Sequence, residues 1–431
     1  MSLKKEFLSY TIPSVFSFVL TGVYCFVDAF FVGNKVGDTG LAAINVSYCL
    51  IALLQALGSG IGLGASVKYS IYKAQGKDKE SQKYLSGAFL LMTILDLIIV
   101  VPMILFPRQL LIAIGASPYV AQIGVPYLLI QSYGSLLQVY STGLMPIVRN
   151  NQGSVISMAA GIFGGLVNAF FDYLFVWVLD MGLPGASAAT LVGQAFALIM
   201  LVSFMLKKKK LILKVDFKGI GRVFKDILII GITPFGLTTV PNITVILLNK
   251  ATLLHGGERG LAAYGCIAYL TFIALLALQG VGDGAQPLIS YYHGKDDKES
   301  LKKVNRYTYI MSLGFALAFM AIEILLRNKL GAFMGALPDT AIIVATALPI
   351  FALAFPFQAF SRSASSILYA TENVLGSYLI TYTEPVFILV SLLALGATYG
   401  LNGVWIACAT GQGLVMLLSV FLILCKSKNK Q

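Results

Sequence analysis

Charged residues are scarce in this sequence of 431 residues: only 12% are Asp, Glu, Lys or Arg, while 58% are hydrophobic. Soluble domains contain about a quarter charged residues on average. The mean hydropathy of the chain is correspondingly high, at +0.83. This composition excludes a soluble enzyme, a disordered chain and a fibrous protein.

Cysteine and histidine are also few, and neither forms a pattern. The five cysteines lie in apolar runs without a CxxC pair, so neither a disulfide framework nor a zinc site is predicted. His255 and His293 fall at loop positions, which argues against a proton relay. No glycine-rich loop ends in Lys-Ser or Lys-Thr, as a nucleotide-binding loop would require. Without a cofactor or ATP-hydrolysing machinery, any transport has to use an ion gradient or run downhill.

Long apolar runs are abundant instead. Each is long enough to cross a hydrocarbon core about 30 Å thick. Read against Gly, Pro and charged breaks, the sequence predicts an all-α membrane protein with twelve transmembrane helices. The predicted spans are 8–33, 40–73, 84–106, 118–147, 154–180, 184–206, 227–253, 260–292, 306–326, 338–367, 375–398 and 401–425.

The charge distribution gives the orientation. The chain has 31 basic and 19 acidic residues, and most of the basic ones fall in the termini, the Lys207–Lys210 run and alternate loops. By the positive-inside rule, both termini are cytoplasmic. We therefore expect a multi-pass protein of the cell (inner) membrane whose basic run contacts lipid headgroups. No nucleic-acid partner is predicted, and we expect a monomer.

The two halves of the chain are similar to each other at an offset near 220 residues. Gly60-x-Gly62-x-Gly64 recurs as Gly280-x-Gly282-x-Gly284, and similar loops follow both runs. An even number of spans per half gives two six-helix lobes related by a pseudo-twofold axis along the membrane normal. The predicted division is an N-lobe at 1–206, a basic linker at 207–226 and a C-lobe at 227–431. Such repeats favour alternating access by rocking of the lobes. The small-residue runs themselves indicate close helix packing.

Acidic residues inside spans are candidates for function because they are costly there. At about 1.5 Å per residue, Asp28, Asp172 and Thr190 lie at a similar depth below the outer surface, and Asn168 lies one turn from Asp172 on the same face. These oxygen-bearing groups suit either Na⁺ or a proton shared with a like-charged neighbour. A purely structural role for Asp28 and Asp172, as helix-bridging groups, is the alternative.

Other intramembrane acids have weaker support. Glu384 could face a cavity and contact a cationic substrate or take part in coupling, and Asp96 lies at mid-depth. Asp283 and Glu323 are interpreted as interfacial or helix-pairing groups.

Several motifs, in this order on a duplicated chain, resemble the multidrug and toxic compound extrusion (MATE) family over nearly the whole sequence. They are Asp28 to Gly33, Gly37 to Ala43, Gly60 to Gly76, Asn168-x-x-x-Asp172, Gly182-x-Pro184-Gly185 and Gly284-Ala285-Gln286-Pro287. The resemblance implies an antiporter that expels cationic, amphipathic small molecules in exchange for H⁺ or Na⁺. It also implies a V-shaped central cavity between the lobes.

The resemblance is closest to the prokaryotic DinF-like branch, whose N-lobe cation cluster corresponds to Asp28, Asn168, Asp172 and Thr190. Pro13 matches a first-helix proline that serves as a hinge in some members. The NorM-like branch has acids in the C-lobe, whereas this chain has Asn249 at the repeat equivalent of Asp28. We therefore predict coupling in the N-lobe, with Asn249 as a further possible contact.

Three other functions are compatible with a polytopic protein. A flippase for a lipid-linked saccharide or another amphipathic lipid is the main alternative, although such proteins usually have extra spans or a cationic cavity. A membrane-bound transferase would need a catalytic cluster in the loops, which are short and rich in Lys. A channel is disfavoured by the duplicated halves.

Overall fold

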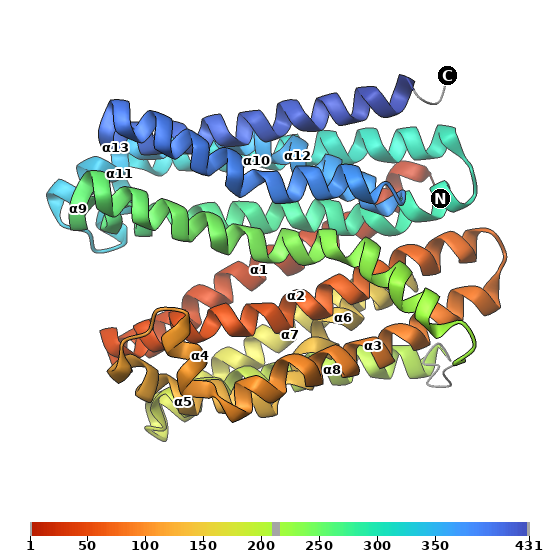
Figure 1. Cartoon of the computed structure of the whole chain (residues 1–431), viewed down its shortest axis with the longest axis horizontal. Helices are drawn as coiled ribbons and strands as arrows, with labels where there is room; N and C mark the ends of the chain where they lie inside the picture. The colour runs from red at the N-terminus through yellow and green to blue at the C-terminus, as the bar shows by residue number, and fades with distance from the viewer. Residues whose placement is uncertain (1, 209–215, 429–431) are drawn as a thin grey trace. The chain divides into compact units, whose positions relative to one another are not determined.

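The protein is almost entirely helical in a computed structural model (Figure 1). The structure describes residues 2–208 and 216–428, except for the side chains of residues 25–30, 32–34, 38 and 426–428. The first half contains α1 (Leu3–Val36), α2 (Asp38–Ala74), α3 (Asp78–Leu105), α4 (Pro107–Ala113), α5 (Pro118–Tyr133), α6 (Ser135–Asn150), α7 (Ser154–Asp172), the π-helix η1 (Tyr173–Val178) and α8 (Gly182–Lys207). The second half contains α9 (Ile220–Gly294), α10 (Lys298–Phe333), α11 (Pro338–Ala352), α12 (Ala354–Ala370) and α13 (Val374–Lys428).

These helices agree with the twelve predicted spans. Among the described residues, 8 helices are long and apolar enough to cross a membrane, and the bent pair α11–α12 adds a ninth candidate. Helices α9 and α13 each contain a non-helical break, at Gly257 and Gly400, so each supplies two spans. Helices α5 and α6 together form the fourth predicted span, interrupted at Gly134.

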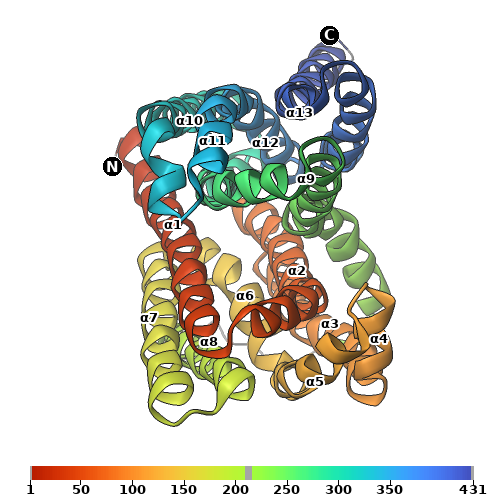
Figure 2. The ribbon, with the colours of Figure 1, turned by 90° about the vertical axis from the view of Figure 1, so that its left-hand side faces the viewer.

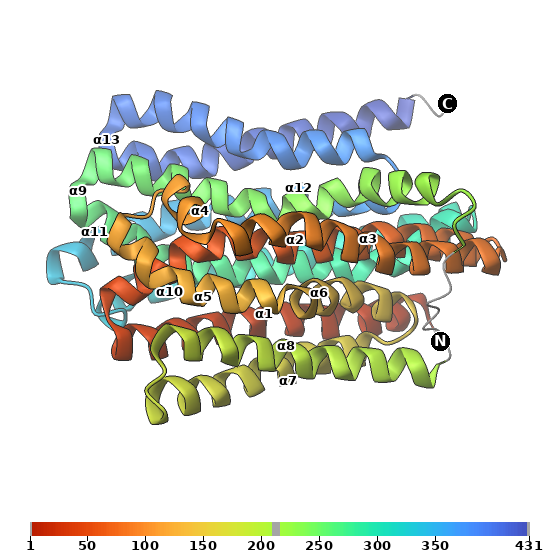
Figure 3. The ribbon, with the colours of Figure 1, turned by 60° about the horizontal axis from the view of Figure 1, so that its bottom comes forward.

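The contacts divide the chain into two compact units. Unit 2 comprises residues 16–238 and 290–297, and unit 1 comprises residues 1–15, 239–289 and 298–431. Within unit 2, α2 packs against α3, α5 and α6, and α7 packs against α8 (Figures 2 and 3). Within unit 1, α10 packs against α11 and α12, and α12 packs against α13. Each unit has its own buried apolar core.

Backbone torsions support the internal duplication. Left-handed φ values between 55° and 108° recur in pairs separated by 220 residues, where one span ends and the next begins. The pairs are Gly37 with Gly257, Gly76 with Asp296, Gly115 with Gly335, Gln152 with Glu372, and Asp180 with Gly400. The reversals of direction therefore occur at equivalent positions in the two halves.

The predicted close packing at the glycine runs is confirmed. In unit 2, a Cβ atom on Gly60 would lie 2.9 Å from the carbonyl oxygen of Gly231. In unit 1, a Cβ atom on Gly280 would lie 2.7 Å from Cα of Val15. Each glycine run thus packs against the first helix of the other half of the sequence. For this reason the contact units differ from the sequence halves at residues 1–15 and 227–238, and they differ also at residues 290–297. The lobe boundaries at 206 and 227 stay a prediction about the repeat.

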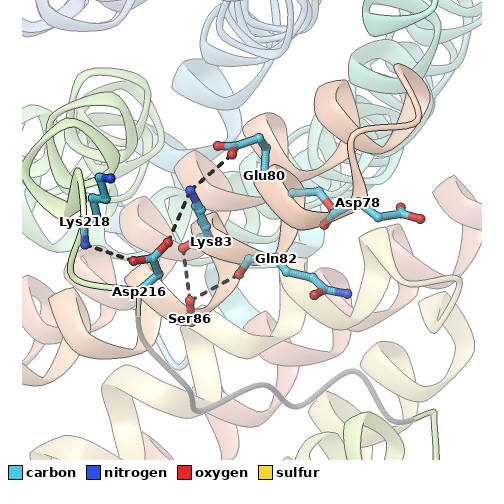
Figure 4. Close-up of polar contacts among 8 residues, drawn as sticks. Asp78, Glu80, Gln82, Lys83, Ser86, Asp216 and Lys218 are labelled. Carbon is cyan, nitrogen blue, oxygen red and sulfur yellow. Dashed lines mark hydrogen bonds and ion pairs between the residues drawn. The ribbon is translucent and has the colours of Figure 1, made fainter.

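The end of the basic linker is attached to α3 in unit 2 (Figure 4). The ammonium of Lys83 lies 3.2 Å from Oε1 of Glu80 and 3.3 Å from Oδ2 of Asp216. The backbone N–H of Lys218 donates to Oδ1 of Asp216 at 3.0 Å. The Lys218 N–H and the Lys83 ammonium lower the pKa of Asp216 below its usual value. Lys209 and Lys210 of the basic run lie outside the described residues.

The linker contact should weaken in acid. Because the folded-state pKa of Asp216 is depressed, its stabilising contribution is present above the unfolded-state pKa of about 4 and is lost as the pH falls through the folded value. Hydrogen exchange of the Lys218 amide, corrected for intrinsic rates, should show protection at neutral pH that declines below about pH 4. Asp216→Asn should remove most of the pH dependence. Equal pH profiles for the two proteins would contradict the contact.

Candidate functional site

Helices α7 and α8 approach each other closely at two glycines. A Cβ atom on Gly193 would lie 2.5 Å from the carbonyl oxygen of Gly164 and 2.8 Å from Cβ of Asn168. A Cβ atom on Gly164 would lie 3.0 Å from the carbonyl oxygen of Gly193. Small residues at such crossings allow backbone contact in membranes. The crossing therefore holds Asn168 directly against α8.

Asn168 and Asp172 form a buried pair one turn apart on α7. Nδ2 of Asn168 donates to Oδ2 of Asp172 at 2.9 Å. The two side chains are 5% and 0% exposed, respectively. The predicted proximity of these two residues is confirmed. A carboxyl group at this depth, held by an amide that accepts and donates hydrogen bonds, can bind a proton or a small cation.

An adjacent glycine face of α7 contacts α1. A Cβ atom on Gly161 would lie 2.5 Å from Oγ of Ser17, and one on Gly165 would lie 2.7 Å from Cδ1 of Tyr24. Both contacts advance in the same direction, so the helices run parallel. Residue 28 is as far along α1 from Ser17 as Asp172 is along α7 from Gly161. The Tyr24–Gly165 contact, and the rings of Phe31 and Tyr173 at 6.4 Å, bring residue 31 to this level instead. Backbone position 28 therefore lies within about one helical turn of the level of Asp172. The side chain of Asp28 lies outside the described residues.

Two features near Asp172 could not be anticipated from the sequence. The helix changes to a π-helix, η1, directly after Asp172, and π-helical turns are frequent at functional sites. No signal in the apolar residues of η1 distinguishes them from an ordinary helix. In addition, the hydroxyl of Thr190 donates to the carbonyl oxygen of Ala186 in its own helix at 3.0 Å. A role for Thr190 at the carboxylate stays a prediction.

The other predicted residues have separate partners. The hydroxyl of Ser135 donates to Oδ2 of Asp96 at 2.9 Å in unit 2. Nε2 of Gln412 donates to Oε1 of Glu384 at 2.9 Å in unit 1. The backbone carbonyl oxygen of Asn249, a half-buried residue, accepts a hydrogen bond from the hydroxyl of Thr252.

Pro13 is buried in unit 1, and α1 continues through it as a helix. Since proline has no N–H, the carbonyl of Ser9 lacks its usual helical partner, which makes this a point where a helix can bend.

Glu323 and Asp283 are both buried, which favours their interpretation as helix-pairing groups. The hydroxyl of Thr271 donates to Glu323 at 3.4 Å, and that of Tyr369 donates to Asp283 at 3.3 Å. Within the described part of the chain, no three His, Cys, Asp or Glu side chains lie close enough together to hold a metal ion. The predicted Na⁺ site includes Asp28, and so this finding does not test it.

Comparison with known proteins adds independent information. The MatE family pattern matches residues 13–174 and again residues 230–391. The double match agrees with the duplication found in the sequence and in the backbone torsions. Together the two matches cover most of the chain.

Similar proteins extend over nearly the full length. The multidrug export protein MepA of Staphylococcus aureus is 23% identical over 437 residues, covering 97% of this chain and 93% of the relative. The structure of a MOP superfamily transporter from Pyrococcus furiosus has a TM-score of 0.91 and 19% identity, covering 100% of this chain and 97% of that one. The structure of a MATE protein in its bent conformation has a TM-score of 0.88, covering 98% and 95% of the two chains. These structural likenesses concern the fold.

The duplicated helical fold, the twelve membrane-crossing segments and the two matches therefore agree on one assignment. This chain is a multi-pass membrane protein of the MatE family, a family of transporters rather than of enzymes.

Proposed function

We propose that this protein is a secondary active multidrug exporter. It expels cationic, amphipathic small molecules in exchange for H⁺ or Na⁺ and uses no other cofactor. Similar full-length proteins are named multidrug export proteins. In this proposal the protein works as a monomer in the cell membrane, with both termini in the cytoplasm.

The observation that supports coupling most directly is the buried Asn168–Asp172 pair. A carboxyl group that is fully buried at membrane depth is costly unless it has a function or a partner. The crossing of α7 and α8 at Gly164 and Gly193 fixes this pair in place. Asp28, at a backbone position within about one helical turn of that level, would add a second carboxyl group and complete a site for a proton or Na⁺.

The coupling mechanism follows from this arrangement. A proton or Na⁺ that arrives from outside binds at Asp28 and Asp172, changes the shape of α1 and weakens the binding of the substrate, which leaves. The ion shifts the conformational equilibrium only through a difference in affinity between the two states. Pro13 provides a bending point in α1. Among the structures similar to this chain, one is described as MATE in the bent conformation and another as MATE in the straight conformation.

A transport assay tests the proposal. Proteoliposomes that contain the purified protein should move ethidium, a fluorescent organic cation, when a pH or Na⁺ gradient is imposed without ATP. Only one of two treatments should stop transport: collapsing the pH gradient if the coupling ion is H⁺, or omitting Na⁺ if it is Na⁺. The effective treatment therefore identifies the ion. Transport unaffected by both treatments, or no transport under either gradient, would contradict ion-coupled export.

A further inference from the structure

Unit 1 contains a buried guanidinium that is only partly satisfied. Arg362 of α12 is 5% exposed, and its Nη1 donates to Oε1 of Gln279 in α9 at 3.4 Å. Its Nε and Nη2 atoms are buried and make no hydrogen bond within residues 2–208 and 216–428. A buried charge without a charged partner is costly, and charged groups at membrane depth are associated with function. Arg362 falls within the predicted span 338–367, and its position within α12 places it inside the helical unit.

A buried acid lies in the neighbouring helix. Glu384, in the first half of α13, is 7% exposed, and its hydrogen-bond partner is Gln412, in the second half of α13. Oε1 of Gln412 is itself buried and has no hydrogen bond among the described residues. Thus each charged group contacts its own neutral carboxamide rather than an opposite charge: Arg362 contacts Gln279, and Glu384 contacts Gln412.

The helix register places Arg362 and Glu384 in one layer. Helices α12 and α13 pack against each other (Figure 2), and a short turn at residues 371–373 makes the start of α13 antiparallel to α12. The hydroxyls of Ser365 and Thr381 share a hydrogen bond at 2.9 Å. Arg362 lies three residues before Ser365 and on the same face of α12. Glu384 lies three residues after Thr381 and on the same face of α13. Among the described residues, the two charged groups do not form an ion pair.

The helices in this layer have points at which they can bend. Pro385 follows Glu384 directly and deprives the carbonyl of Thr381 of its helical hydrogen bond. Helix α12 begins after a 41° bend from α11. A small change at either point would alter the separation of the guanidinium and the carboxylate, and opposite charges attract more strongly in a poorly hydrated interior than in water.

We propose that Glu384 binds the positive group of the transported organic cation and that Arg362 competes with it. Gln412 and Gln279 hold the two charged groups apart in the conformation described here. When the guanidinium approaches the carboxylate, the bound cation loses its partner and is released. Arg362 is thus a positioning residue that acts through Glu384 and sets the balance between binding and release. This inference rests on the proposed export of organic cations.

Two measurements on purified full-length variants test the inference. The first is the dissociation constant of ethidium from fluorescence anisotropy, which needs no gradient, and the second is the maximal transport rate in proteoliposomes. Arg362→Gln should tighten ethidium binding by about threefold to tenfold and lower the maximal rate, because the competing charge is gone. Glu384→Gln should weaken binding by about tenfold or more. The double variant should bind like Glu384→Gln alone, since residues that act on each other are not additive.

Two further variants serve as controls. Arg327→Gln removes a positive charge from an exposed position of α10 and should change neither quantity. Arg362→Lys keeps a positive charge when its amine is protonated, which is favoured at about pH 6 over neutral pH because burial lowers the pKa of a lysine. At that pH it should tighten ethidium binding less than Arg362→Gln does, which tests the same point if Arg362→Gln lowers the yield of folded protein.

The results separate the two proposals. Any of three results would overturn the inference. They are unchanged ethidium binding in Arg362→Gln, additive effects in the double variant, and equal tightening of binding in Arg362→Lys and Arg362→Gln. Absence of ethidium binding to the wild type would also overturn it. Normal ethidium binding without gradient-driven transport would instead contradict the proposed function. In that case the anisotropy data alone would decide whether Glu384 and Arg362 have the proposed roles in binding.

Discussion

Replacing Asp172 by Asn is expected to reduce gradient-driven ethidium export by about 100-fold without loss of folded protein. Asparagine has nearly the same volume as aspartate, so the buried position at the end of α7 is still filled. Its side-chain carbonyl can still accept the hydrogen bond that Asn168 donates at 2.9 Å. The substitution removes only the ability to bind a proton or a cation by charge. Initial rates in proteoliposomes under an imposed pH or Na⁺ gradient measure the effect.

Asp180→Asn is the matched control for this substitution. Asp180 is an exposed aspartate of the same unit, 3.1 Å from the ammonium of Lys35. Exposed ion pairs contribute about 0–1 kcal/mol, and Asn tolerates the left-handed backbone of this position. Asp180→Asn should therefore export ethidium at the wild-type rate. If Asp172→Asn retained full export, the assignment of coupling to unit 2 would be wrong.

Replacing Gly193 by Ala is expected to lower the free energy of unfolding by about 1–3 kcal/mol. The added methyl group would lie 2.5 Å from the carbonyl oxygen of Gly164 and 2.8 Å from Cβ of Asn168. Because both are parts of a packed helix pair, α7 and α8 have to separate. The separation would also displace the Asn168–Asp172 pair, so ion-driven export should fall together with stability. Thermal unfolding in detergent and the ethidium assay measure the two effects.

Gly314→Ala provides the comparison. Gly314 lies within α10, and a Cβ atom there has no neighbour within 4 Å. Alanine is a better helix former than glycine by roughly 1 kcal/mol, so this variant should be as stable as the wild type or slightly more stable. Equal stability of Gly193→Ala and the wild type would show that the α7–α8 crossing is looser than the structure describes.

The sequence predicts most of the fold because the membrane constrains it strongly. Apolar runs long enough to cross a bilayer locate the spans, and repeated glycine motifs reveal the duplication. The breaks within spans are less predictable. Gly134 and Leu353 interrupt the fourth and tenth spans within apolar sequence, where no charge or loop composition marks a boundary.

The candidate site is predictable where it depends on local helix geometry. Asn168 and Asp172 are four residues apart, and this spacing alone predicts their contact. The Thr190 hydroxyl depends on its rotamer, which spacing does not determine, and it donates to its own helix. The burial of Arg362 depends on how α12 packs in unit 1, and a count of basic residues along the chain cannot show this.

Ion release on substrate binding tests the central claim most directly. Ethidium is added to purified protein in weakly buffered solution, and released protons are followed with a pH indicator, or displaced Na⁺ with a radioactive tracer. If substrate and ion oppose each other through the α7 carboxyl group, the wild type releases H⁺ or Na⁺ upon saturation with ethidium and Asp172→Asn releases neither. Equal release from both proteins, or ethidium binding without release from the wild type, would contradict exchange coupled at Asp172.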